Sequence, residues 1–447
     1  MNIVKRWTES SLILRIVLGL VIGAVLGFLA HAGFVPDDME PISMLGTLFV
    51  GALKAIAPVL VFFLVISALS NAKAPKSMRS VIVLYVASTL IAGIVSVAMS
   101  YLMPSTLTFA DASAVEQAAP SDLGTVVETL LTNCVTNPVL SLTNANYLGI
   151  LVWSIFLGIA LRAAATPTRK VVQDVSDAVL KVVRGIIQCA PFGIIGLVYD
   201  SVAQNGASIF VEYGHIIAVL LVAMAIIAFI TNPLLAFFTF KKNPYPLVWR
   251  CLKDSAVYAF FTRSSAANIP VNMNLCRSLG LNRDTYAVSI PLGATINMAG
   301  ACVTITVMTM ACANTLGISI DPVMAVILCV LAAVSACGAS GVPGGSLLLI
   351  PMCCSLFGIS NDVAMQVVAV GFIIGVIQDS CETALNSSSD ALFTASADYR
   401  EMRKQGLEFA PGKDAESVSS EVIAADYDPM NPTDHELDHP AGTVLER

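Results

Sequence analysis

The sequence predicts an all-α polytopic membrane protein, with eight transmembrane helices and two opposed re-entrant helical hairpins that form inverted repeats. Of its 447 residues, 56% are hydrophobic and only 12% are charged, whereas a soluble domain has about 45–50% and about 25%. Long apolar runs recur along the chain, and two late ones are interrupted by polar stretches that contain Gly or Pro. Because so few charges cannot cover a water-soluble surface of this size, we expect the chain to lie mostly in lipid.

The apolar runs are the expected membrane segments, because a helix needs about 20 apolar residues to cross a bilayer. We interpret the first run as an uncleaved span rather than a signal peptide. It is longer than a secretory apolar region of about 7–15 residues, and it carries Arg15 near its start. The runs lie near residues 11–32, 43–70, 80–103, 147–161, 182–199, 215–240, 284–316, 322–357 and 363–395.

The distribution of Lys and Arg sets the orientation. The connections 33–42, 104–146 and 200–214 contain no Lys or Arg, whereas the N-terminus and the connections that alternate with them do. Cytoplasmic connections of membrane proteins are enriched in these residues. The alternation therefore predicts six crossings with a cytoplasmic N-terminus, and the basic residues at 400–404 place the C-terminus on the same side.

The run at 322–357 is expected to enter and leave the membrane on one side. It is far longer than one span, and its middle, Cys337-Gly-Ala-Ser-Gly-Val-Pro-Gly-Gly-Ser346, cannot be continuous helix. Three crossings after Arg283 would also place the basic residues that begin at Arg400 outside, against the charge rule. The run is therefore predicted to be a helical hairpin that enters from outside.

A second interruption, at about 252–276, is expected to enter from the opposite side. The polar stretch 262–270 lies between basic flanks at Arg250 and Arg277, which place both ends in the cytoplasm. Broken backbone is tolerated at membrane depth only where it is buried in protein or lines a cavity. Two broken segments in matching positions and opposite orientation are typical of inverted-repeat transporters.

The last expected span carries the side chains that most strongly indicate chemistry. Asp379, Thr383, Asn386 and Asp390 recur at i, i+4, i+7 and i+11, which places them within roughly 60° of one another on a helix, and Glu382 flanks this stripe. Carboxylates on one face of a membrane helix are costly and mark an ion or substrate path. The alternative, a carboxylate near a helix end that reaches water, suits Asp390 better than Asp379.

Span seven contains Gly293-Ala-Thr-Ile-Asn-Met-Ala-Gly300, whose two glycines and Asn297 loosen a helix in mid-membrane. Freed carbonyls, an amide oxygen and a carboxylate are the ligands of a hard cation such as Na⁺. Close helix packing is the alternative role of the glycines, but the neighbouring Asp390 favours ion binding. Hairpin tips add backbone N–H groups that suit a carboxylate, and Asp379 suits an ammonium, so the residues themselves indicate an amino acid as cargo.

Four segments resemble the dicarboxylate/amino acid:cation symporter family, the family of glutamate and neutral amino acid transporters. The resemblance covers roughly residues 15–395, with the motifs in the family's order. The stretches 258–273 and 378–390 are similar to those of bacterial members that carry serine and threonine with sodium. The four segments are Arg263-Ser-Ser-Ala-Ala-Asn-Ile-Pro270, Gly293-Ala-Thr-Ile-Asn-Met-Ala-Gly300, Gly341-Val-Pro-Gly-Gly345 and Asp379…Asn386…Asp390.

The resemblance implies a role for each matching residue. In the family, backbone groups of the first hairpin tip and a residue of the last span meet the substrate carboxylate, the second hairpin tip forms the extracellular gate, and an acid pairs with the substrate amino group. The matching substrate positions are Ser264, Ser265, Val342, Pro343, Gly344, Asp379 and Asn386. One implied sodium site comprises Gly293, Asn297, Asn386 and Asp390, and another uses the backbone carbonyl of Thr295 with carbonyls of the second hairpin.

The family also implies the organisation of the chain. Its members form homotrimers in the lipid bilayer and move substrate by an elevator-like shift of the hairpin-bearing core. Residues 1–249 are expected to be mainly scaffold and trimerisation helices, and residues 398–447 a disordered cytoplasmic tail. That tail explains the net charge of −7, because 406–447 holds ten acidic and two basic residues, and the charge is no sign of a nucleic-acid partner. The core, 250–397, contains hairpin 1 (252–276), span seven (283–316), hairpin 2 (322–357) and span eight (363–395).

Two departures from the acidic-substrate members bear on the cargo. Those members carry an arginine where this chain has Glu382, which would repel an anionic side chain. A hydroxyl-bearing side chain can instead bond Thr383 or Glu382, unless Glu382 points aside and pairs with another polar group. Ala299 and Ala301 replace an aspartate and a threonine near a further sodium site, so we expect fewer coupled sodium ions.

These observations predict a sodium-coupled symporter of the bacterial inner membrane that imports L-serine and L-threonine, with Na⁺ as co-transported ion and no organic cofactor. Another small neutral amino acid, or a dicarboxylate, is the alternative cargo. A channel is disfavoured, because it would conduct continuously through rings or stacks of ligands. An intramembrane enzyme is disfavoured, because no histidine lies at the depth of Ser265 to activate it.

Overall fold

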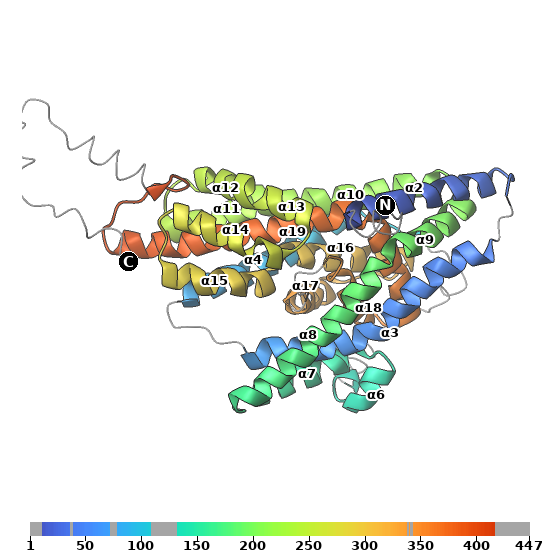
Figure 1. The fold of residues 1–447 in the computed structure, drawn as a ribbon, viewed down its shortest axis with the longest axis horizontal. Coiled ribbons are helices and arrows are strands. Elements are labelled where there is room, and N and C mark those ends of the chain that lie inside the picture. The colour runs from blue at the N-terminus through green and yellow to red at the C-terminus, as the bar shows by residue number, and fades with distance from the viewer. Residues whose placement is uncertain are drawn as a thin grey trace, which may run out of the picture.

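The computed structural model describes residues 11–35, 39–71, 78–108, 132–337, 339 and 343–415. Within these residues the chain is entirely helical and contains no strand (Figure 1). The helices up to the end of the sixth expected span are α2 (Leu12–His31), α3 (Glu40–Asn71), α4 (Arg79–Leu102), α6 (Pro138–Thr143), α7 (Tyr147–Leu161), α8 (Thr166–Gln188), α9 (Ala190–Asn205), α10 (Ser208–Ile226), η3 (Ile227–Thr231) and α11 (Asn232–Phe240). They are followed by α12 (Tyr245–Cys251), η4 (Leu252–Ala256), α13 (Val257–Thr262), α14 (Ser265–Ser278), α15 (Arg283–Ile296), α16 (Ala299–Thr315), α17 (Pro322–Ala336), η5 (Leu347–Leu349), α18 (Ile350–Ser355) and α19 (Asn361–Lys404).

Six helical segments of the described chain are long and apolar enough to cross a membrane, and a multi-pass membrane protein is thereby confirmed. They coincide with six of the expected runs, in α2, α3, α4, α10–α11, α15–α16 and α19. A seventh span results if α8 and α9 count as one. These two helices meet at Cys189 with a bend of 53°, so the run expected at 182–199 is divided between them.

The first interrupted segment folds as two helical arms joined by a tight turn. Arg263 adopts a left-handed conformation (φ 51°), and Ser264 is extended and accepts a hydrogen bond from the N–H of Ala267, which caps α14. Nδ2 of Asn268 in the second arm donates to Oγ of Ser255 in the first (2.8 Å). The arms run back from the turn to Tyr245 and Ser278, beyond the expected bounds of 252–276.

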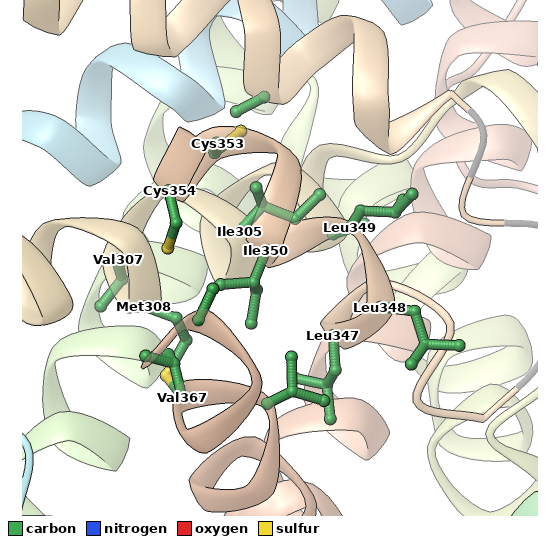
Figure 2. Close-up of a cluster of buried hydrophobic side chains, with 14 of the residues drawn as sticks. Ile305, Val307, Met308, Leu347, Leu348, Leu349, Ile350, Cys353, Cys354 and Val367 are labelled. Atoms are coloured by element: carbon green, nitrogen blue, oxygen red, sulfur yellow. The ribbon is translucent and has the colours of Figure 1, made fainter. Parts of the chain in front are cut away.

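The second interrupted segment comprises α17, the single turn η5 and the short helix α18. Its second arm is held by apolar packing, because Leu347, Leu348 and Ile350 lie among side chains of α16 and α19 (Figure 2). Gly344 precedes this arm with a φ of 71°, and a Cβ there would approach the ring of Phe372 to 2.9 Å. Only glycine therefore allows this turn to lie directly on α19.

Span seven is broken where its sequence predicts weakness. α15 ends at Ile296, Asn297 and Met298 have non-helical dihedral angles, and α16 begins at Ala299. At Gly300 a Cβ would lie 2.7 Å from the main-chain oxygen of Glu382. Gly300 thus permits α16 to touch the backbone of α19, so close helix packing does apply to this glycine.

The last helix extends beyond residue 398, where the tail is expected to start. α19 continues to Lys404, and residues 405–415 fold back over its end. The ring of Phe409 stacks on Tyr399 at a centroid distance of 4.9 Å, and Nζ of Lys242 donates to the main-chain oxygen of Phe409 (2.8 Å). The buried aromatic pair explains why an acidic segment packs here. Residues 416–447 of the expected tail lie outside the described residues.

The helices pack in groups that cut across the expected boundary at residue 249. α2, α3, α7, α8 and α9 pack chiefly on one another. By contrast, α4 packs against α16 and α17, and α10 and α11 pack against α19. Spans three and six therefore join the C-terminal half, and order along the chain does not separate scaffold from core.

Candidate functional site

The polar stripe expected on the last span exists and is buried. All of its side chains lie on α19 with little exposed surface, and Asp390 is only 1% exposed. The alternative that Asp390 reaches water at a helix end therefore does not describe this structure. The buried members of the stripe are Asp379, Glu382, Thr383, Asn386 and Asp390.

One end of the stripe is built from Asp390 and Asn297. Asn297 occupies the break between α15 and α16, and its Nδ2 donates to Oδ1 of Asp390 (2.8 Å) and to Oγ of Ser389 (2.7 Å). Its Oδ1 is buried and accepts no hydrogen bond from the described part of the chain. A buried unpaired amide oxygen beside a buried carboxylate suits a hard cation, which would satisfy both.

Gly293 borders this end of the site. A Cβ at this position would lie 2.5 Å from Oδ1 of Asp390 and 2.8 Å from the Tyr85 hydroxyl oxygen. That hydroxyl donates to the main-chain oxygens of Ser289 (3.2 Å) and Asp390 (3.3 Å), so α4 also supports the cluster. Any larger residue at 293 would have to displace the carboxylate.

Asn386 links the Asp390 end to the middle of the stripe. Its Oδ1 accepts the N–H of Gly300 (2.7 Å), its Nδ2 donates to Sδ of Met298 (3.4 Å), and its main-chain oxygen accepts Nδ2 of Asn297 (3.3 Å). The side chain of Asn386 therefore spans the first turn of α16. A displacement of either helix changes these contacts.

Asp379 is held by both interrupted segments. Nε of Arg263, at the turn of the first segment, donates to Oδ2 of Asp379 (2.6 Å), and both side chains are buried. The N–H of Gly344, which precedes the second arm of the second segment, donates to Oδ1 of Asp379 (3.1 Å). One carboxylate thus joins α19 to the turns of the two segments.

Glu382 lies one helical turn further along α19 and has a different set of partners. Its Oε2 accepts hydrogen bonds from Oγ1 of Thr304 (2.7 Å), Oγ of Ser346 (2.8 Å) and Nε2 of Gln378 (2.5 Å). These donors belong to α16, to the segment before η5 and to α19. The geometry favours the alternative that Glu382 pairs with polar groups of the protein.

The remaining expected residues are less closely engaged. Thr383 donates to the main-chain oxygen of Asp379 (2.8 Å), and the exposed Thr295 donates to that of Leu292 (2.7 Å), so neither hydroxyl points across the site. Ser264 and the buried Ser265 adjoin Arg263 at the first turn, and Pro343 is half-buried beside Gly344. Val342 lies outside the described residues.

Several residues of the site were given no role by the sequence. Arg263 is part of the matching motif, and an arginine expected at membrane depth requires an acid partner, which was the available signal for its pairing with Asp379. Ser346, Thr304 and Gln378 carried no such signal, because each resembles many hydroxyl and amide side chains of the chain. Only the fold brings them onto one carboxylate oxygen.

Comparisons with known proteins show which sequences the chain is similar to. A sequence model described as the sodium:dicarboxylate symporter family matches residues 12–399. The serine/threonine transporter SstT of Streptococcus thermophilus is 53% identical over 403 residues, which are 90% of this chain and 99% of that relative. The serine/threonine transporter SstT of Streptococcus agalactiae serotype III is 54% identical over 396 residues, which are 88% of this chain and 97% of that relative.

Proposed function

Because the chain belongs to the sodium:dicarboxylate symporter family, we propose that it is a sodium-coupled symporter that imports L-serine and L-threonine. The family and the relatives are transporters, so the enzyme alternative is excluded. The observation that carries the proposal is the buried Asp390 beside Asn297, whose Oδ1 has no partner among the described residues, on the same face of α19 as Asp379.

The cations would bind at the broken span. Asp390 supplies the charge, and the side-chain oxygens of Asn297 and Asn386 and the carbonyl at Gly293 supply neutral ligands, a set that suits Na⁺ better than a soft metal. The carbonyl of Thr295 would serve a second site. Ala299 and Ala301 offer no oxygen side chain for a third site, so we expect fewer coupled sodium ions than in acidic-substrate relatives.

The amino acid would bind between the two turns. Its ammonium would join Asp379, and its carboxylate would meet backbone groups near Ser264 and Ser265 and the amide of Asn386. The segment at Val342, Pro343 and Gly344 would cover it from the other side. The hydroxyl of serine or threonine would bond Glu382, on the oxygen that the protein leaves free, or Thr383.

A dicarboxylate remains the second candidate because of Arg263. Its Nη1 is buried and has no hydrogen-bond partner among the described residues, so it offers a charged donor to an anionic group. Asp379 already neutralises the guanidinium, however, and Glu382 adds a nearby negative charge. The balance of charge favours a neutral side chain, and competition of aspartate against serine distinguishes the two candidates.

An elevator-type movement is supported by the lengthwise displacement of α19 relative to α3, because the start of α19 lies beside the middle of α3 and not beside its start. Lys54 forms an ion pair with Asp362 in the first turn of α19, although Lys54 lies fourteen residues, or about 21 Å, along α3 from Glu40. In Figure 1 the other end of α19 extends well beyond the end of α3. We propose that this arrangement is the core displaced toward the cytoplasm.

The membrane setting follows from the same proposal. We place eight spans and two re-entrant hairpins in the bacterial inner membrane, with both termini in the cytoplasm. α2 exposes a row of large apolar side chains, which include Leu14, Val21 and Val25. Such a surface suits contact with lipid or with neighbouring copies, and we propose a homotrimer.

The test is uptake of radiolabelled L-serine into proteoliposomes under a sodium gradient, with potassium as the replacement ion. We expect saturable uptake that requires sodium, and its loss in Asp379→Asn and Asp390→Ala. Saturation and dependence on the gradient distinguish a symporter from a channel. Undiminished uptake in potassium would reject the proposal, and inhibition by aspartate but not by threonine would favour the dicarboxylate candidate.

A further inference from the structure

The buried carboxylate of Glu382 accepts all of its hydrogen bonds from the described residues on one oxygen. Oε2 accepts three hydrogen bonds, from Thr304, Ser346 and Gln378. Within the described part of the chain no hydrogen bond reaches Oε1. A carboxylate accepts about four hydrogen bonds in total, so the remaining capacity of Glu382 lies on Oε1.

The three donors fix the direction of this open oxygen. They come from different elements, and the side chains of Thr304, Ser346 and Gln378 are each at most 1% exposed. Nε2 of Gln378 also donates to Oγ1 of Thr304 (2.7 Å), so two of the donors hold each other. Rotation of the carboxylate would leave buried donors without an acceptor, which is energetically unfavourable.

Ser346 differs from the other two donors in its position. Thr304 and Gln378 lie in the middle of long helices that pack against each other. Ser346 lies two residues after Gly344, whose N–H donates to Asp379. The short segment 344–346 therefore touches both acids, the one expected to hold the ammonium and the one nearest the substrate side chain.

We propose that Ser346, with Thr304 and Gln378, is a positioning residue that orients Oε1 of Glu382 to accept the hydroxyl of the substrate. This inference rests on the proposed function and adds the means by which a hydroxyl is preferred over a hydrogen. Because Ser346 belongs to the segment 344–346, the preference for a hydroxyl requires that this segment contacts α19. The substrate is read as serine or threonine rather than alanine because only a hydroxyl satisfies the oriented oxygen.

The experiment measures the KM of labelled serine uptake and the inhibition constant of unlabelled alanine, in proteoliposomes under an inward sodium gradient. Ser346→Ala is expected to reduce the preference for serine over alanine by about two- to tenfold, the worth of one net hydrogen bond. The change should lie in the KM of serine and not in the inhibition constant of alanine. Ser346→Thr retains the hydroxyl and should retain the preference.

Ser355→Ala is the matched control, because Ser355 lies on the same arm and its hydroxyl donates to the main-chain oxygen of Met352 (2.7 Å). It should leave the preference unchanged. If Ser346→Ala does not fold, Thr304→Val and Thr304→Ser give the same comparison for the second hydroxyl donor.

Two results would overturn the inference while leaving the proposed function intact. In one, Ser346→Ala lowers the maximal rate but leaves the ratio of serine KM to alanine inhibition constant unchanged, as a purely structural role would. In the other, Ser355→Ala changes that ratio as much as Ser346→Ala. A wild-type protein that takes up no serine in a sodium gradient would overturn both proposals, so the two failures are distinguishable.

Discussion

Replacement of Gly293 by alanine tests the proposed cation site directly. The added Cβ would lie 2.5 Å from Oδ1 and 2.8 Å from Cγ of Asp390. Real Cβ atoms do not approach other atoms so closely, so the carboxylate must move away from Nδ2 of Asn297, to which it is bonded at 2.8 Å. A hydrogen bond to a charged group contributes about 1.5–3 kcal/mol. We therefore expect the apparent sodium affinity to fall by about 10- to 100-fold.

The assay for Gly293→Ala is the sodium concentration that gives half-maximal serine uptake, measured in proteoliposomes. Gly375→Ala is the matched control, because Gly375 also lies in a helix of the core but has no atom within 4 Å of an added Cβ. It should transport with unchanged sodium dependence. An unaltered half-maximal concentration in Gly293→Ala would refute the assignment of cation binding to this cluster, as would an equal effect of both variants.

Three further perturbations address other parts of the molecule. Arg263→Gln should abolish serine uptake, because it leaves the buried carboxylate of Asp379 without its charge partner, while Arg263→Lys should restore part of the rate; equal activity of both with the wild type would contradict this pairing. Lys54→Met and Asp362→Asn should each shift the ratio of inward- to outward-accessible protein, measured by cysteine labelling, by about two- to fivefold. The shift is modest because the ion pair is partly exposed to solvent. The double variant should show a non-additive effect, and additive effects would count against a direct pairing. Truncation after residue 404 should lower the melting temperature in detergent by removing the buried Phe409, whereas truncation after 415 should not, and equal melting temperatures would show that the packing of 405–415 contributes nothing.

Much of the helical architecture could be predicted from the sequence, because the length of an apolar run and the basic residues beside it are properties of short stretches of chain. The stripe from Asp379 to Asp390 followed from helical periodicity, and the break at Asn297 followed from the glycines near it. Contacts between distant segments did not follow, because no local pattern encodes them. Arg263 and Asp379 are 116 residues apart, and which hydroxyl meets Glu382 depends on how α16 packs on α19.

Several structural details near the expected boundaries could not be predicted from the sequence, for related physical reasons. The tail was predicted from charge composition, which does not reveal that Phe409 packs against Tyr399 and Phe240 or that Lys242 bonds its main-chain oxygen. The run 182–199 is mostly apolar and contains Arg184 and Gln188, and its hydropathy does not reveal the bend at Cys189. The grouping of α4 with the core is likewise a property of packed surfaces and not of order along the chain.

The proposed coupling between sodium and the amino acid would depend on the geometry of Asn386. It is four residues from Glu382 and four from Asp390, so it stands one helical turn from each of the two acids on the same face of α19. Its side-chain oxygen accepts the N–H of Gly300, and its main-chain oxygen accepts Nδ2 of Asn297. Both oxygens therefore contact the broken span. A cation that draws Oδ1 of Asn297 inward must alter the second of these bonds, and a substrate carboxylate that engages the Asn386 amide must alter the first. Under the proposed function, each ligand would therefore change the site of the other through one residue, which is the differential interaction that coupled binding requires.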